Sequence, residues 1–175
     1  IVLNGFIHGT GFVCLHSNKV ITCAHVIDTT KKLVFTAGSD DIFNLKLIWL
    51  DTIADLAILE SESDICSVPM IPINNKSIIE TTELYYIGYD KDANSLLPLA
   101  KQIKLDTLNP NNRNIEFQGE AKQGYSGGPV INNKGEVVAV LKMVVSGHLL
   151  IKSKNEMIPY KKIICSLANN IKERL

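Results

Sequence analysis

The sequence predicts an all-β fold, a pair of β-barrels followed by one C-terminal α-helix. Short apolar segments of strand length recur along most of the chain, and turn-forming residues separate them. This number and spacing of strands fits a pair of barrels better than a fold of alternating strands and helices. The tail differs, because apolar residues at helical spacing behind a proline predict a helix over about 159–173: Pro159, Ile163, Ile164, Leu167 and Ile171.

The first part of the chain, about 1–80, is predicted to form the N-terminal barrel. Its first two strands indicate a hairpin, because polar residues separate two short apolar runs. A later and longer strand alternates between apolar and polar positions. Residues 61–82 lose this pattern and contain several Ser, Pro and Asn residues, which predicts a connection between two lobes. The predicted strands are 11–15, 19–22, 33–35, 42–50 and 56–59.

The next part, about 81–155, repeats the pattern of short strands and is predicted to form the C-terminal barrel. Residues 132–135 have the sequence Asn-Asn-Lys-Gly, which favours a tight turn because Asn and Gly tolerate a positive φ. The predicted strands are 84–87, 96–105, 115–117, 130–131 and 137–145.

Composition and charge narrow the class of partner. The apolar fraction is 46%, the charged fraction is 21% and the formal net charge is zero, as in soluble globular proteins. The two signs of charge are interspersed, so we expect neither a nucleic acid nor an anionic membrane surface as a partner. Apolar runs do not reach the length of a membrane span. The chain opens on Ile1 without a visible signal peptide, so we expect a cytoplasmic protein or one domain excised from a larger protein.

Four cysteines are spread along the chain without an obvious pairing pattern. They could form two disulfides, but their spacing favours small buried residues in a reducing compartment. The sequence contains no Cys-x-x-Cys motif, and its Cys and His residues do not have the spacing of zinc ligands, so we expect no bound metal ion. The four are Cys14, Cys23, Cys66 and Cys165.

Ser126 is the candidate nucleophile, because it lies in the motif Gly-Tyr-Ser-Gly-Gly-Pro at 124–129. A serine hydroxyl is a weak nucleophile at neutral pH and needs a base within hydrogen-bonding reach. Glycines beside it permit a backbone turn that can direct N–H groups towards one point. The alternative is a glycine-rich turn that contains a serine by coincidence.

His25 is the candidate base, and Asp55 is the candidate carboxylate that orients it. His25 follows Thr-Cys-Ala at 22–24, and the unperturbed pKa of imidazole suits proton transfer near neutral pH. Asp55 opens an apolar strand, where a partly buried carboxylate needs a partner such as a histidine N–H. A core histidine and a strand-end or surface acid are the alternatives. Asp51 competes with Asp55 for the orienting role.

These segments occur in the order His, Asp, Ser, and together they resemble the trypsin/chymotrypsin superfamily of serine peptidases. The finer similarity is to the HtrA-like, or trypsin-2, branch, and it covers nearly the whole chain. The segments that carry it are 8–13, 20–26, 55–59, 124–129, 135–138 and 157–159.

The resemblance implies two perpendicular six-stranded β-barrels with the active site in the cleft between them. It also implies cleavage of peptide bonds in a protein or peptide substrate through an acyl-enzyme, with no cofactor. In this family the N–H of the nucleophile and the N–H two residues earlier form the oxyanion hole, which here are those of Ser126 and Gly124. Asp55 matches the family pattern better than Asp51.

Two positions bear on activation and specificity through the same resemblance. In activated digestive enzymes the residue before the nucleophile is an aspartate that pairs with the terminal amine. Here it is Tyr125, so we expect no activation by insertion of the N-terminus.

Glu120 lies where trypsin-type enzymes place the floor of the primary pocket, but a solvated loop glutamate is the alternative. We expect the substrate to add as a strand along 137–145, with Lys142 or Val144 at the pocket wall.

The leading hypothesis for function is therefore an active serine endopeptidase. The alternative is a trypsin-like domain without activity of its own, which either binds peptides or proteins or awaits activation by a partner. The presence of all three residues, Ser126, His25 and Asp55, favours the enzyme.

Overall fold

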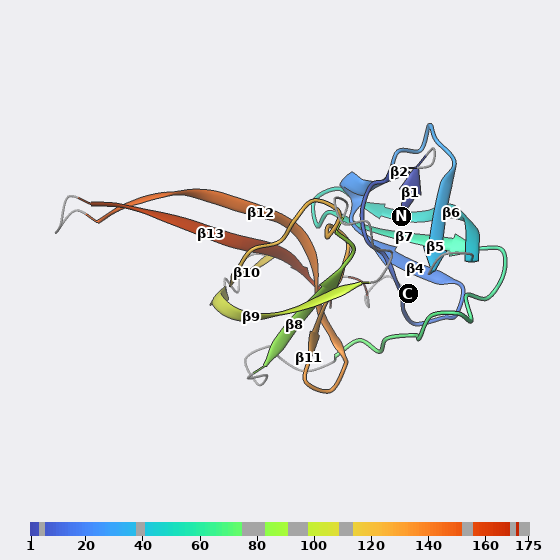
Figure 1. Cartoon of the computed structure of the whole chain (residues 1–175). Coiled ribbons are helices and arrows are strands. Elements are labelled where there is room, and N and C mark those ends of the chain that lie inside the picture. The colour runs from blue at the N-terminus through green and yellow to red at the C-terminus, as the bar shows by residue number, and fades with distance from the viewer. Residues whose placement is uncertain are drawn as a thin grey trace.

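The structure is a computed structural model that describes residues 1–3, 6–37, 41–74, 83–90, 98–108, 114–151, 156–168 and 171. It has two β-lobes, which follow each other in the sequence and lie next to each other in space (Figure 1). The all-β prediction is confirmed. The predicted division between the lobes near residue 80 stays a prediction, because residues 75–82 lie outside the described parts of the chain.

The first lobe is a seven-stranded antiparallel sheet with the order β2-β1-β5-β6-β7-β4-β3. The strongest alternation is in β6, where residues on one face are exposed and those on the other are half-buried. Strand β7 is buried along most of its length, because it lies between β6 and β4. The strands are β1 (Val2–Leu3), β2 (Phe6–Ile7), β3 (Phe12–Val13), β4 (Lys19–Thr22), β5 (Leu33–Ala37), β6 (Asp41–Asp51) and β7 (Leu56–Ser61).

The second lobe is a closed barrel of six strands with the order β10-β13-β12-β11-β8-β9. Its longest pairing joins β12 and β13, and this hairpin continues beyond the barrel as a projecting two-stranded arm (Figure 1). The strands are β8 (Leu84–Gly88), β9 (Leu99–Leu108), β10 (Asn114–Gln118), β11 (Pro129–Asn132), β12 (Val137–Ile151) and β13 (Glu156–Leu167).

The two lobes share buried contacts. Val137 and Val140 belong to the second lobe by sequence, yet they are buried in the apolar core of the first. Val137 also forms an isolated parallel bridge with Ile73 from the connection between the lobes. Ser166 on β13 donates a hydrogen bond to the carbonyl of Ala54, which lies in the turn beside β7. These contacts fix the relative position of the lobes, and the cavity described below lies between them.

The prediction of two closed six-stranded barrels is confirmed for the second lobe only. In the described part of the first lobe, the two ends of the sheet are β2 and β3, and they are not paired with each other. Strands β1, β2 and β3 have two residues each, which is too short for the ladder of hydrogen bonds that closes a barrel.

The predicted helix over about 159–173 is wrong for the residues up to Leu167, which lie in β13. Ile163 and Cys165 alternate towards the barrel interior and are fully buried there, as a period of two requires. Pairing with β10 and β12 has overridden the helical spacing. Ile171 is helical, and residues 169, 170 and 172–175 lie outside the described residues.

The prediction that the cysteines are buried is confirmed for three residues and wrong for one. All four cysteines are free thiols, and Cys14, Cys23 and Cys165 are buried. Cys66 is exposed, because it lies in a turn of the connection between the lobes. None of the helical residues that the structure describes forms a helix with the length and apolarity needed to cross a membrane.

Candidate active site

A cavity of about 520 Å³ lies between the two lobes and contains all three predicted catalytic residues. The first lobe contributes the turn between β6 and β7 and a short 3₁₀ helix after β4, Ala24–Val26. The second lobe contributes the loop before β11 and the middle of β12. The lining residues are His25, Thr52, Asp55, Ala121, Lys122, Gln123, Ser126, Lys142, Met143 and Val144.

His25 and Asp55 are in direct contact. Asp55 Oδ2 lies 2.8 Å from His25 Nδ1, and Asp55 Oδ1 accepts a hydrogen bond of 2.9 Å from the His25 backbone N–H. The carboxylate is largely buried, whereas the imidazole is 46% exposed towards the cavity. An ionised carboxylate on Nδ1 favours the tautomer with its proton there, so Nε2 is left as a proton acceptor.

The two candidate aspartates have different surroundings in the turn between β6 and β7. Asp51 Oδ1 accepts the backbone N–H groups of Ile53 and Ala54, at 2.9 and 2.8 Å. This carboxylate therefore closes the turn, as Asp often does. Asp55 follows in the left-handed backbone region, with φ 55°, a conformation that Asp tolerates better than most residues. The contact with the imidazole that the structure records is made by Asp55.

The electrostatic environment keeps Asp55 ionised. Burial raises the pKa of this carboxyl, whereas the hydrogen bonds from the His25 ring and backbone lower it. The charge of His25 and the ammonium group of Lys142 act in the same direction. The pKa of Asp55 consequently lies below its ordinary value, and the group is a carboxylate at neutral pH.

Ser126 lies in the same cavity, on the glycine-rich loop before β11. Its hydroxyl donates a hydrogen bond of 2.9 Å to the carbonyl oxygen of Lys142, and this is the bond that the structure records for Ser126 Oγ. Proton transfer to His25 therefore requires the hydroxyl to leave this acceptor and direct its proton to the imidazole. Such catalytic hydrogen bonds are often long or misaligned before substrate binds.

The loop in front of Ser126 has the turn geometry that the glycines predict. The backbone N–H of Tyr125 donates to the carbonyl of Lys122 at 3.3 Å, which closes a four-residue turn. Gly124 is the third residue of this turn and has φ 99°, as a type II turn requires. Within the described residues, the N–H groups of Gly124 and Ser126 have no recorded protein acceptor. Both remain available to a bound oxyanion.

Cys23 lies close enough to His25 and Asp55 for the three side chains to approach one ion. The possible ligand atoms lie within 4.8 Å of one another. However, the Cys23 thiol is fully buried and donates to the carbonyl of Leu141. Burial, followed by the nearby Asp55 charge, raises the pKa of this thiol well above its ordinary value. A neutral thiol is a poor metal ligand and a poorer nucleophile than a thiolate. The cluster of Cys23, His25 and Asp55 is therefore better explained by the direct contact between Asp55 and His25 than by a bound metal ion.

The predicted substrate-binding residues divide into two groups. Lys142 and Val144 line the cavity together with Met143 between them. Glu120 does not line it: its side chain is 67% exposed, and its carboxylate pairs with Lys161 Nζ at 2.6 Å. This position favours the alternative of a solvated loop glutamate.

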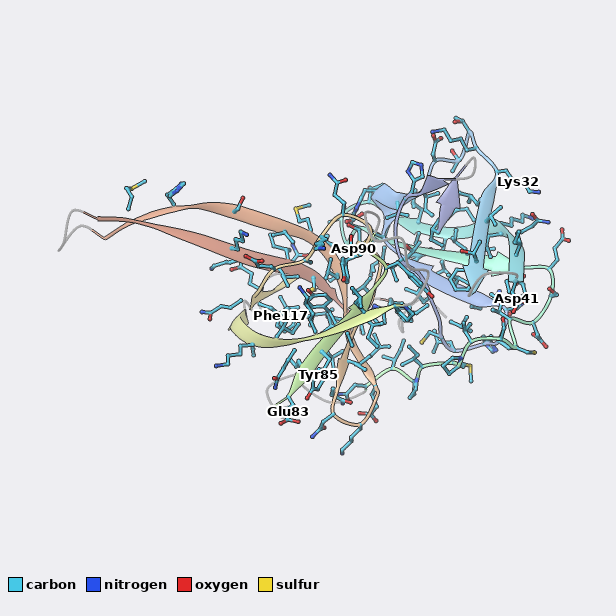
Figure 2. The ribbon with its side chains drawn as sticks, viewed as in Figure 1. Lys32, Asp41, Glu83, Tyr85, Asp90 and Phe117 are labelled. Atoms are coloured by element: carbon cyan, nitrogen blue, oxygen red, sulfur yellow. The ribbon has the colours of Figure 1, made fainter. Side chains whose placement is uncertain are left out.

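Several lining residues carried no recognisable signal in the sequence, since they are ordinary polar residues in a loop. Lys122 is the clearest case. Its ammonium group lies 2.5 Å from Asp90, which is itself 3% exposed. Asp90 is located where the barrel meets the first lobe (Figure 2). This ion pair ties the loop before Ser126 to the segment after β8.

Tyr125, the residue before Ser126, is an apolar anchor of the loop. It is 1% exposed, and its ring packs edge-to-face on Tyr86 with 5.3 Å between ring centroids. Gly88 permits this packing, because a Cβ there would lie 2.2 Å from Tyr125 Cδ1. The space that would hold an aspartate in a digestive enzyme is thus filled by an aromatic ring.

We expect Tyr125→Ala to lower the free energy of unfolding by about 3 to 5 kcal/mol, the usual cost of truncating a buried aromatic residue. Urea unfolding measures this change. Tyr85→Ala is the matched control, since Tyr85 lies on β8 beside Tyr86 but is only half-buried, and its cost should be clearly smaller. Equal losses for the two variants would contradict the anchoring role of Tyr125.

A two-lobed β-fold with the candidate residues in the cavity between its lobes defines the class of chymotrypsin-like proteins. Residues 9–140 match the trypsin-like peptidase domain family, and the chain belongs to this family. The predicted similarity to the HtrA-like branch is confirmed, because the relatives include DegP-like and DegS proteases.

Individual relatives are distant in sequence but similar in fold. The serine endoprotease DegS of Escherichia coli is 26% identical over 137 residues, which is 75% of this chain and 38% of that protein. The structure of a serine endoprotease from Yersinia pestis has a TM-score of 0.69 at 20% identity and covers 94% of this chain and 55% of that one. The active form of the Rv3671c protease from M. tuberculosis has a TM-score of 0.67 at 20% identity, with coverage of 95% and 71%.

The chain spans less than half the length of the curated relatives described here, between 29% and 44%. It is homologous to trypsin-like serine endoproteases. The substrates and partners of those longer proteins are not transferred to this chain by the match.

Proposed function

We propose that this chain is a serine endopeptidase that hydrolyses peptide bonds through an acyl-enzyme on Ser126. His25 is the general base and then the general acid, and Asp55 orients it. The observation that carries the proposal is the contact of both Asp55 carboxylate oxygens with His25 in a cavity that also contains Ser126. The substrate is a protein or peptide, and the chain acts as one domain of a larger protein.

The acid–base steps follow from this contact. When the Ser126 side chain turns from Lys142 towards the imidazole, Nε2 can take the hydroxyl proton while Oγ attacks the substrate carbonyl carbon. The imidazolium that forms is stabilised by the Asp55 carboxylate. The same proton then passes to the leaving amine, and a water molecule repeats the sequence to release the acid.

The developing negative charge needs donors in place before the reaction. We assign this role to the N–H groups of Gly124 and Ser126, which have no recorded protein acceptor within the described residues. Removal of a single donor of this kind in a serine protease raises the barrier by about 3 to 4 kcal/mol.

Strand β12 provides an edge on which an extended substrate can pair. In the described ladder, β11 pairs with β12 only as far as Val140, whereas β13 continues on the other side. Lys142 is skipped by the β12–β13 register, so a bulge turns the strand at the cavity. This geometry supports binding of the substrate as an added strand beside Lys142, Met143 and Val144.

A fluorophosphonate probe tests the proposal directly. We expect one label per folded chain, located on Ser126 by peptide mapping, and none after heat unfolding. Ser126→Ala should not be labelled, while Ser146→Ala, which changes an exposed serine further along β12, should be labelled as wild type. A folded wild-type chain that never reacts, with or without peptide present, would rule the enzyme out.

A latent domain is the second candidate, because the Ser126 hydroxyl bonds to the Lys142 carbonyl in this structure. In that case the rotation of Ser126 towards His25 would depend on an activating ligand. Labelling would then be slow for the chain alone and faster with a long peptide, whereas a preformed enzyme would be labelled fast alone and no faster with the peptide, which competes for the same site.

A further inference from the structure

We propose that Thr10, a buried residue of the first lobe, is the positioning residue that sets the oxyanion hole in the second lobe. The inference rests on the proposed function and adds a residue to it. Thr10 is 3% exposed and lies outside the three catalytic positions. Its backbone N–H donates to the carbonyl of Ser126 at 2.8 Å, and its hydroxyl donates to the carbonyl of Gly124 at 2.7 Å.

These two bonds hold alternate peptide units of the loop. The unit between Gly124 and Tyr125 is bound at its carbonyl by Thr10 and at its N–H by the Lys122 carbonyl. The unit between Ser126 and Gly127 is bound at its carbonyl by Thr10 and at its N–H by the Leu141 carbonyl, at 2.8 Å. Because a peptide unit is planar, a unit that is held at both ends cannot rotate.

The unit between these two carries the Ser126 N–H of the oxyanion hole. Its carbonyl, that of Tyr125, accepts a bond of 2.9 Å from the N–H of Gly128. Rotation of this middle unit is prevented by its fixed neighbours and by that bond. The Ser126 N–H therefore keeps one direction. The Gly124 N–H precedes the peptide unit between Gly124 and Tyr125, which is held at both ends and so restricts this N–H as well.

The hydroxyl of Thr10 has its own direction fixed. It accepts a hydrogen bond of 3.0 Å from the backbone N–H of Tyr89, so its proton is directed to Gly124. The Thr10 carbonyl in turn accepts a bond of 2.7 Å from the Thr22 hydroxyl. Thr10 thus joins the first lobe, the end of β8 and the nucleophile loop.

Two glycines let the chains come this close. A Cβ on Gly127 would lie 2.2 Å from the Thr10 carbonyl oxygen, and a Cβ on Gly9 would lie 2.8 Å from the Ser126 carbonyl oxygen. Loss of the Thr10 hydroxyl would leave the Gly124 carbonyl buried without this donor. Gly124 could then change its φ and ψ at little steric cost, which would move its N–H out of the hole.

The test compares Thr10→Ala with Thr10→Ser. Both variants lose the same methyl group, and only the serine keeps the hydroxyl. We expect Thr10→Ala to lower kcat by about 10²-fold with KM within about threefold, because the oxyanion forms only in the transition state. We expect Thr10→Ser to keep kcat within about threefold of wild type.

A matched control separates positioning from general destabilisation. Asn132→Ala removes buried side-chain hydrogen bonds to the backbone N–H groups of Lys134 and Glu136, at a residue that is 3% exposed like Thr10 but does not line the cavity. Its melting temperature should fall about as far as that of Thr10→Ala, while its kcat should stay within about threefold of wild type.

A peptide aldehyde gives a second measurement, since its hemiacetal oxygen occupies the oxyanion hole. Its affinity should fall in Thr10→Ala by the same factor as kcat/KM, while the affinity of the corresponding product peptide should not change. An active wild type with equal kcat in Thr10→Ala and Thr10→Ser would overturn this inference alone. An inactive wild type would overturn the proposed function, and this inference with it.

Discussion

We expect Ser126→Ala and His25→Ala each to lower kcat by about 10⁶-fold, and the double variant to be no slower than either single one. The reason is that Ser126 without a base is a poor nucleophile, and His25 without Ser126 has no proton to transfer. The interaction free energy of the pair should therefore nearly equal the effect of one substitution. Initial rates of peptide cleavage with each variant at high enzyme concentration measure this.

The residual rate is informative as well. It should exceed the rate in water by about 10³- to 10⁴-fold, because the oxyanion hole and the substrate-binding edge remain. Additive effects of the two substitutions would show that Ser126 and His25 act independently, and would contradict the proposed mechanism. Unfolding curves that match wild type are the necessary control, since neither side chain lies in the apolar core.

The three catalytic candidates could be named from the sequence, because each stands in a short local motif. Most of the strands could also be predicted, since alternation and turn residues act over a few neighbours. The turn at 132–135 is an example: Asn132 Oδ1 accepts the N–H of Lys134, and Gly135 has φ 76°. Features of this kind depend on neighbouring residues only, so they can be predicted without knowledge of the fold.

The failed predictions involve distant partners. The tail around Ile163 has helical spacing, yet pairing with β10 and β12 placed it in the barrel. The open first lobe depends on strands of two residues, which are too short to show in periodicity. Thr10 carries no chemical signal of its own, since its role comes from Gly124, 114 positions away in sequence. Sequence spacing cannot show such contacts.

The contact between Asp55 and His25 leads to the second large effect. We expect Asp55→Asn to lower kcat by about 10⁴-fold at neutral pH with the fold intact. An asparagine amide can donate to Nδ1, which would move the imidazole proton to Nε2. Nε2 would then have no lone pair for the serine proton, so the loss arises from the wrong tautomer and not from misplaced atoms.

Asp51→Asn is the matched control, because it makes the same chemical change four residues away. Its side-chain oxygen can still accept the N–H groups of Ile53 and Ala54, so the turn should persist and kcat should stay within about threefold of wild type. A large loss of kcat in Asp51→Asn with a small loss in Asp55→Asn would show that Asp51, and not Asp55, orients His25. Equal, large losses with lowered melting temperatures would indicate instead that the turn between β6 and β7 had unfolded, since Asp51 closes that turn and Asp55 joins it to His25.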